Sequence, residues 1–186
     1  MNKPKFFTTI RPLFGKLTDS QVKAIEFILS YWEAQSLVTD IRQFAYILAT
    51  IQHETANTML PIEEYGRGKG LTYGTPDPVT KQVYYGRGYI QLTWKANYEK
   101  FAHLLGANLI VKPELALNPD ISIQIAFIGM KNGMFTGKKL DDYIYKDKID
   151  FVWARSIVNG KRKGEPLPDK AELIASYAKV YWEALR

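Results

Sequence analysis

Hydrophobic residues recur at intervals of three and four along much of the chain, which is the pattern of amphipathic helices. A first helix is predicted over residues 18–35, where Thr18 and Gln21 have the spacing of a capping box. A second is predicted to start at Thr39-Asp40 and to keep one apolar face as far as Ile51. Such a face is ordinarily core, so this second helix is predicted to be buried.

The later part of the chain repeats this helical pattern around one different segment. Between Gly66 and Gly88 the sequence is rich in glycine and tyrosine, which indicates loops and turns. The β-prone runs Gln82–Tyr85 and Tyr89–Thr93 flank Gly86-Arg87-Gly88 and predict a small hairpin. Further helices are predicted over residues 94–105, 118–133, 141–145, 150–158 and 168–185. The fold class predicted is therefore mainly α, with a small β-hairpin lobe.

Length and composition are those of one globular domain spanning residues 1–186. The chain has 186 residues, 46% of them hydrophobic, and no internal repeat or polar linker. It contains no cysteine, which excludes disulfides and thiolate metal sites. We see no signal peptide and no apolar run long enough to span a membrane. These features predict synthesis in the cytoplasm, a monomer without stable membrane insertion, and release by another agent if the protein acts on a cell wall.

The balance of charge favours a polyanionic partner. The formal net charge is +6 at pH 7 and the isoelectric point is about 9.3. Nucleic acid and an anionic cell wall both fit that charge, but no groove-reading helix or aromatic stripe supports nucleic acid. The one basic cluster, Lys161-Arg162-Lys163, is predicted to be a solvated turn.

The spacing of the candidate residues does not fit a metal-binding or a nucleotide-binding motif. His53-Glu54 begins like a metalloprotease helix, but Asn57 stands where the second histidine is needed. Gly66-Arg67-Gly68 and Gly86-Arg87-Gly88 open like phosphate loops yet lack the third glycine and the helix that should follow. We therefore predict no metal and no cofactor.

Carboxylates remain as the candidate catalytic groups. Cleavage of a glycoside needs one acid to protonate the leaving oxygen and one carboxylate to activate water. Glu54, at the end of the buried helix, suits the acid, and Glu63 or Glu64 suits the base. Alternation along an extended connector favours Glu64 as the inward residue. Surface placement of these acids is the plainer alternative, and His53 is predicted to be a hydrogen-bonding residue at the helix end.

Three patches of sequence resemble glycoside hydrolase family 19, the plant-type chitinases and related phage endolysins. His53-Glu54-Thr55 resembles the family's H-E-T motif. Tyr84–Thr93, followed by Asn97-Tyr98, resembles its Y-Y-G-R-G-x-I-Q-[IL]-[ST] and N-Y motifs. Ile157–Gly160 with Asp169-Lys170 is similar to a late, weaker motif, in which lysine replaces the usual arginine. The resemblance implies a lysozyme-like helical fold.

The resemblance also implies a role for each matching residue. Glu54 would be the general acid and Glu64 the second carboxylate, with Glu63 in reserve. Thr93 would hold the attacking water in an inverting reaction. The residues implied to bind or support the substrate are His53, Glu63, Tyr85, Arg87, Gln91, Asn97, Tyr98 and Asn159.

Departures from the family pattern affect the expected substrate. The chain lacks the cysteine-bearing loops of the plant chitinases, and its compact, basic character resembles the endolysins more closely. Peptidoglycan and chitin both contain β-1,4-linked N-acetylglucosamine, and only peptidoglycan is anionic. We therefore expect an endolysin-type glycosidase of bacterial peptidoglycan. The alternatives are a chitinase and a non-catalytic glycan-binding relative.

Overall fold

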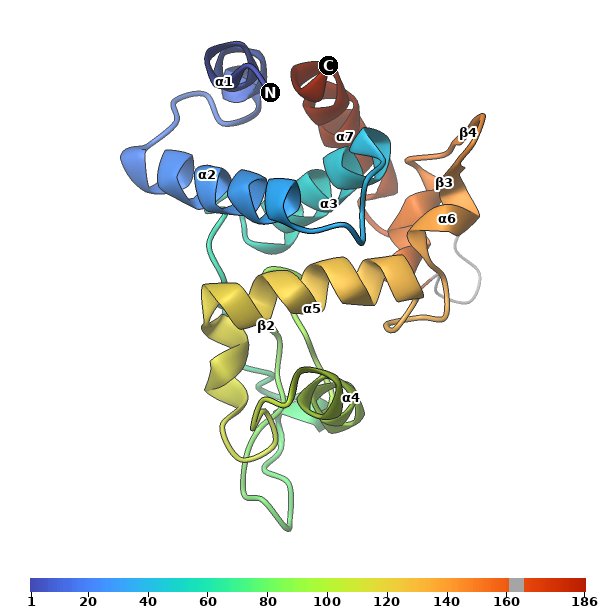
Figure 1. Ribbon diagram of the computed structural model, residues 1–186. Helices are drawn as coiled ribbons and strands as arrows, with labels where there is room; N and C mark the ends of the chain where they lie inside the picture. The colour runs from blue at the N-terminus through green and yellow to red at the C-terminus, as the bar shows by residue number, and fades with distance from the viewer. Residues whose placement is uncertain (161–165) are drawn as a thin grey trace.

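The computed structural model describes residues 1–160 and 166–186, which form two lobes joined by a long helix (Figure 1). The upper lobe contains α1, α2, α3 and α7, and the lower lobe contains α4 and the segment around β2, with α5 between them. The helices are α1 (Lys3–Ile10), α2 (Asp19–Ala34), α3 (Ile41–Glu54), α4 (Lys95–Leu105), α5 (Pro119–Asn132), α6 (Leu140–Tyr143) and α7 (Ala171–Leu185). Short 3-10 helices cover Arg11–Leu13, Thr72–Gly74, Pro113–Leu117 and Trp153–Ile157.

Helix α3 is the centre of the upper lobe. Every residue from Gln43 to Gln52 is buried, and α7 packs along the helix. Asp40 caps its start by accepting a hydrogen bond from the Arg42 amide at 2.8 Å. A helix buried on all sides is fixed in direction by its neighbours, so the side chain at its C-terminal end, Glu54, is fixed in place too.

The prediction of a mainly helical fold is confirmed, and most helix boundaries agree within two residues. Thr18 and Gln21 form the predicted capping box at the start of α2. The start of α7 differs from its prediction, because Lys170 occupies the N-cap with a φ of 60° and no side chain caps the helix. The predicted helix over residues 150–158 is a 3-10 helix, and α1 was not predicted.

The predicted hairpin over residues 82–93 is wrong in its pairing. Strand β2 (Arg87–Gly88) pairs antiparallel with β1 (Ile62–Glu63), with Glu63 opposite Arg87. The residues after β2 turn back on it through a single bridge between Arg87 and Leu92. A second two-stranded sheet, β3 (Ile144–Tyr145) with β4 (Lys148–Ile149), occupies the end of the predicted helix 141–145. The small β element therefore exists, but its main partner is the connector that carries Glu63 and Glu64.

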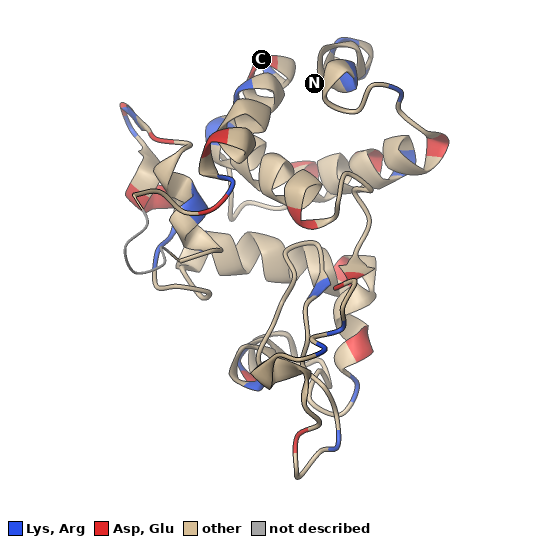
Figure 2. Ribbon diagram, turned by 180° about the vertical axis from the view of Figure 1, so that it is seen from behind, with Lys and Arg blue, Asp and Glu red and all other residues tan. Residues whose placement is uncertain are grey.

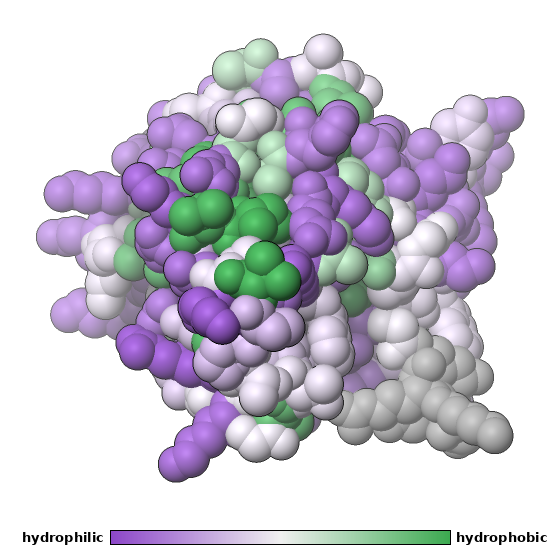
Figure 3. All heavy atoms as spheres, turned by 90° about the horizontal axis from the view of Figure 1, so that it is seen from below, coloured by the Kyte–Doolittle hydropathy of each residue, from purple (hydrophilic) through white to green (hydrophobic). Residues whose placement is uncertain are grey.

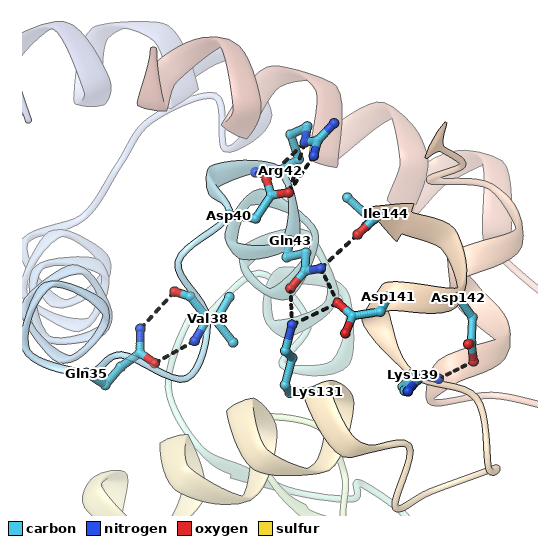
Figure 4. A network of polar contacts seen from close by, with 10 residues as sticks. All are labelled: Gln35, Val38, Asp40, Arg42, Gln43, Lys131, Lys139, Asp141, Asp142 and Ile144. Atoms are coloured by element: carbon cyan, nitrogen blue, oxygen red, sulfur yellow. Dashed lines mark hydrogen bonds and ion pairs between the residues drawn. The ribbon is translucent and has the colours of Figure 1, made fainter. Parts of the chain in front are cut away.

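A polar network connects α3 to α5 and α6. The Gln43 amide donates to Asp141 Oδ1 at 2.7 Å and to the Ile144 carbonyl at 2.7 Å. The Lys131 ammonium donates to the same Asp141 oxygen at 2.8 Å and to Gln43 Oε1 at 3.1 Å (Figure 4). Burial raises the pKa of Asp141, but the hydrogen bonds from Lys131 and Gln43 lower it by more, so the pKa lies below its usual value. The ionised carboxylate is thus a structural link between three elements.

Charged residues are spread over both lobes (Figure 2), while the sequences of α3 and α5 contain few of them. Seen from below, hydrophobic side chains gather in a small group among hydrophilic ones (Figure 3). Within residues 1–160 and 166–186, no helix is both long enough and apolar enough to cross a membrane. The predicted solvated turn at Lys161-Arg162-Lys163 lies outside the described residues.

We expect Asp141→Asn to lower the free energy of unfolding by about 1–2 kcal/mol at pH 7, because a charge-assisted hydrogen bond to Lys131 is lost. Since the folded-state pKa of Asp141 is depressed, this stability is present above the unfolded pKa and is lost as pH falls through the folded pKa. Urea unfolding at pH 7 and pH 3 measures both effects. The exposed Asp147→Asn is the control; an equal loss in both variants would contradict the role of the network.

Candidate functional site

Glu54 lies at the last position of α3 and is paired with a cation. Arg155, in the 3-10 helix Trp153–Ile157, places Nη1 2.5 Å from Glu54 Oε1. The Glu54 side chain is 14% exposed and that of Arg155 is 6% exposed. Arg155 Nε also donates to the Asp169 carbonyl at 3.2 Å, which fixes the guanidinium from behind. The pair holds Oε1, so Oε2 is the oxygen of Glu54 left to act on a bound molecule.

Glu63 and Glu64 point to different partners, as alternation along the connector predicts. Glu63 accepts from the Tyr85 hydroxyl at 2.6 Å and pairs with Arg67 at 2.8 Å. Glu64 accepts from the Tyr73 hydroxyl at 2.8 Å and from the Gly86 amide at 3.0 Å. Glu63, whose side chain is 29% exposed, is thus held by Tyr85 and Arg67, and Glu64 is held by two neutral donors.

Tyr73 reaches Glu64 because the intervening loop folds back on itself. A Cβ on Gly74 would overlap the backbone of Gly68, so this contact requires glycine. Burial raises the pKa of Tyr73 to about 12, and its hydrogen bond to Glu64 adds to the effect, so the phenol stays protonated and donates. The loop therefore positions the second carboxylate, a role for Tyr73 that the sequence did not reveal.

A groove of about 620 Å³ lies between the lobes and is called the main groove below. The predicted residues that line it are Gln91, Thr93, Asn97 and Asn159. The Thr93 hydroxyl donates to the Gln91 carbonyl at 2.8 Å, so its lone pairs can accept from a water or a sugar. Asn97 donates to the Thr93 carbonyl at 2.9 Å and supports that turn.

Each candidate acid is connected to a wall of the main groove. Tyr73, the partner of Glu64, lines the groove directly. Asn159 also lines the groove. Its backbone amide donates at 3.0 Å to the carbonyl of Arg155, which is the partner of Glu54. Glu54, Glu64 and Arg155 are not among the lining residues, so each carboxylate is linked to the groove through a neighbour, Glu64 through Tyr73 and Glu54 through Arg155 and Asn159.

Tyr85, Arg87 and Tyr98 lie beneath this turn. The Arg87 guanidinium lies 3.6 Å from the centre of the Tyr85 ring and donates to the Tyr98 hydroxyl at 3.1 Å. Tyr98 is fully buried and donates to the Tyr85 carbonyl at 2.8 Å. All three residues are buried and support the turn, the role that the resemblance implies for Arg87, and the predicted substrate contacts of Tyr85 and Tyr98 stay predictions.

His53 is half-buried beside Glu54 and is absent from the residues that line the main groove. Burial lowers the pKa of His53 below its usual value; Glu54 opposes this effect and Arg155 adds to it. A lowered pKa favours the neutral imidazole, and the hydrogen-bonding role predicted for His53 stays a prediction. Among the described residues, no group of three or more histidine and acidic side chains is arranged to hold a metal ion.

Sequence comparison connects the central segment to plant chitinases. Residues 64–134 match the family model described as "Chitinase class I". An endochitinase of Arabidopsis thaliana, At2g43620, is 38% identical over 87 residues, which cover 46% of this chain and 30% of the relative. An endochitinase of Phaseolus vulgaris is 28% identical over 116 residues, covering 55% and 35%. The matched region spans about a third of the length of these relatives.

Structural comparison covers nearly the whole chain. Chitinase C from Streptomyces griseus HUT6037 superposes with a TM-score of 0.64 at 21% identity, covering 96% of this chain and 75% of the other. A bacterial family 19 chitinase superposes with a TM-score of 0.60 at 16% identity, covering 96% and 93%. The chain therefore has the mainly helical, lysozyme-like fold of the family 19 chitinases. Its central segment, residues 64–134, also matches the chitinase class I family model in sequence.

We expect Arg155→Gln to lower the free energy of unfolding by about 3 kcal/mol, because it leaves a mostly buried Glu54 without its counter-charge. Adding Glu54→Gln should restore part of that loss, which a double-mutant cycle by urea unfolding measures. Arg186→Gln, at an exposed ion pair with Glu183, is the control and should cost less than about 1 kcal/mol. Additive losses in the double variant would show that the two side chains do not interact.

Proposed function

We propose that this chain is an inverting glycosidase that cleaves β-1,4 bonds in polymers containing N-acetylglucosamine. The observation that carries the proposal is the main groove, whose lining residue Tyr73 binds Glu64 and whose lining residue Asn159 binds Arg155, the partner of Glu54. Two carboxylates supported from the walls of one groove are the groups that this reaction requires.

In the proposed mechanism Glu54 is the general acid. Arg155 orients the carboxyl group through Oε1, and Oε2, once it has taken up a proton from solvent, delivers that proton to the leaving oxygen. The arginine charge then stabilises the carboxylate that remains. Glu64, held by Tyr73 and the Gly86 amide, accepts a proton from the attacking water, and the Thr93 hydroxyl helps to orient that water. Water attacks the anomeric carbon as the glycosidic bond breaks, which inverts its configuration.

Chitin-type polymers are the first candidate substrate, since the relatives and the similar structures are named as chitinases. Bacterial peptidoglycan is the second candidate, favoured by the net charge of +6. In the second case the protein would act as an endolysin, made in the cytoplasm and acting on the cell wall after release.

Digestion of purified peptidoglycan and of chitin in parallel tests the proposal. Mass spectrometry of the soluble fragments identifies the cleaved bond, and the anomeric configuration of the first product reports inversion. New reducing ends at N-acetylglucosamine units from either polymer support the proposal, and the preferred polymer decides between the two candidates. Absence of soluble fragments from both would overturn it.

We expect Glu54→Gln to reduce turnover at least about 100-fold, since amide cannot supply the proton. Binding of substrate fragments should persist, because neither volume nor the groove lining changes. Steady-state rates and calorimetric titration separate the two effects. A variant that kept wild-type turnover would remove Glu54 from the mechanism.

Glu64→Gln and Glu63→Gln form a matched pair that decides the second carboxylate. We expect the first to abolish turnover with little change in stability. The second should retain most turnover but unfold about 1–2 kcal/mol more easily, because it weakens contacts with Tyr85 and Arg67. Rates and urea unfolding of both variants are compared with wild type. The reverse pattern would assign the base to Glu63.

A further inference from the structure

Trp94 has an unusual backbone conformation for a large side chain. Its φ is 74°, a region that bulky residues rarely adopt. The conformation is held by hydrogen bonds, since the Trp94 amide donates to the Tyr84 carbonyl at 2.9 Å and its carbonyl accepts from the Asn97 amide at 3.0 Å. The Trp94 residue is nevertheless 50% exposed. Backbone strain that leaves an aromatic ring half in solvent is not explained by core packing, and such strain is typical of ligand-binding positions.

A second hollow of about 230 Å³ lies beside the main groove. Tyr73 and Trp94 line both, so they form the ridge between the two spaces. Their rings meet edge to face, with centroids 5.1 Å apart and an interplanar angle of 73°. The hollow is called the proline hollow below, because Pro76 and Pro78 line its other side.

The polar groups that line the proline hollow are already hydrogen-bonded, so the surface it exposes is mainly apolar. The Asp77 carboxylate accepts from the Thr80 amide at 2.8 Å and from the Lys95 ammonium at 2.9 Å. The Tyr84 hydroxyl donates to the Ile110 carbonyl at 2.8 Å. With these polar groups satisfied, the proline rings and the aromatic rings of Tyr84 and Trp94 remain for contact. Such a surface suits the apolar face of a sugar ring or the methyl group of an N-acetyl substituent.

We propose that the proline hollow is an accessory subsite for one further N-acetylhexosamine ring of the polymer, with Trp94 as the platform on which the sugar stacks. This inference rests on the proposed function and adds to it a dependence on substrate length. A short oligomer fills the main groove, whereas a longer one passes the ridge of Tyr73 and Trp94 and gains contacts in the proline hollow.

Calorimetric titration with the tetramer and the hexamer of β-1,4-linked N-acetylglucosamine tests the subsite without requiring turnover. All variants carry Glu54→Gln to prevent cleavage. We expect the parent to bind the hexamer more tightly than the tetramer. Adding Trp94→Ala should weaken hexamer binding about 10-fold and tetramer binding by a smaller factor, since Trp94 also borders the main groove, while Trp94→Phe should keep most of the affinity because it keeps a ring.

Two further variants keep the test independent of changes at Trp94 itself. Thr75→Trp should fill the proline hollow and weaken only hexamer binding, since Thr75 lines that hollow and not the main groove. Tyr145→Ala removes an aromatic ring of similar exposure, 52%, from the β3–β4 hairpin and should change neither affinity. Equal losses for both oligomers, or no loss for the hexamer, would overturn the subsite alone. A parent that binds neither oligomer would overturn the chitin-type substrate of the proposed function and the subsite with it.

Discussion

The ion pair between Glu54 and Arg155 is the interaction on which the site depends. A carboxylate placed at the end of a buried helix loses most of its hydration, and that loss is severe without a nearby counter-charge. The structure solves the problem with a buried guanidinium that is itself anchored to the Asp169 carbonyl. The pair connects α3 to the segment that supplies Asn159. The same ion pair therefore fixes the position of Glu54 and holds one wall of the groove against α3.

The other wall depends on local backbone geometry. Positive φ values at Gln91 and Trp94 bracket Thr93, which lines the groove. Beneath them, the Arg87 guanidinium fills the space between the Tyr85 and Tyr98 rings and holds the turn by hydrogen bonds. The glycine-rich stretch that indicated loop in the sequence is thus an ordered wall, stabilised by buried aromatic and charged groups.

The sequence predicted what is local and missed what is distant. Helix α3 and the capping box at Thr18 follow from spacing within a few residues, and the structure confirms both. The hairpin was placed wrongly because its true partners are only two residues each and lie some 25 positions apart, which no periodicity encodes. Helix α1 was missed because it is short. The signal that could have revealed it is Asn2 before Pro4, since the Asn2 side chain accepts a hydrogen bond from the Lys5 amide at 3.0 Å and caps the helix. The role of Arg155 could not be predicted, because a short 3-10 helix has no apolar periodicity and the partner of Arg155, Glu54, is 101 positions away in sequence.

That separation in sequence has a consequence for biosynthesis. Loop closure over so many residues is slow compared with forming local helices. During translation, α3 and the glycine–tyrosine turn emerge well before residue 155. Until then Glu54 lacks its counter-ion Arg155, and the main groove lacks the wall that contains Asn159. The proposed catalytic site would therefore be complete only at the end of folding, when the segment that carries Arg155 and Asn159 docks.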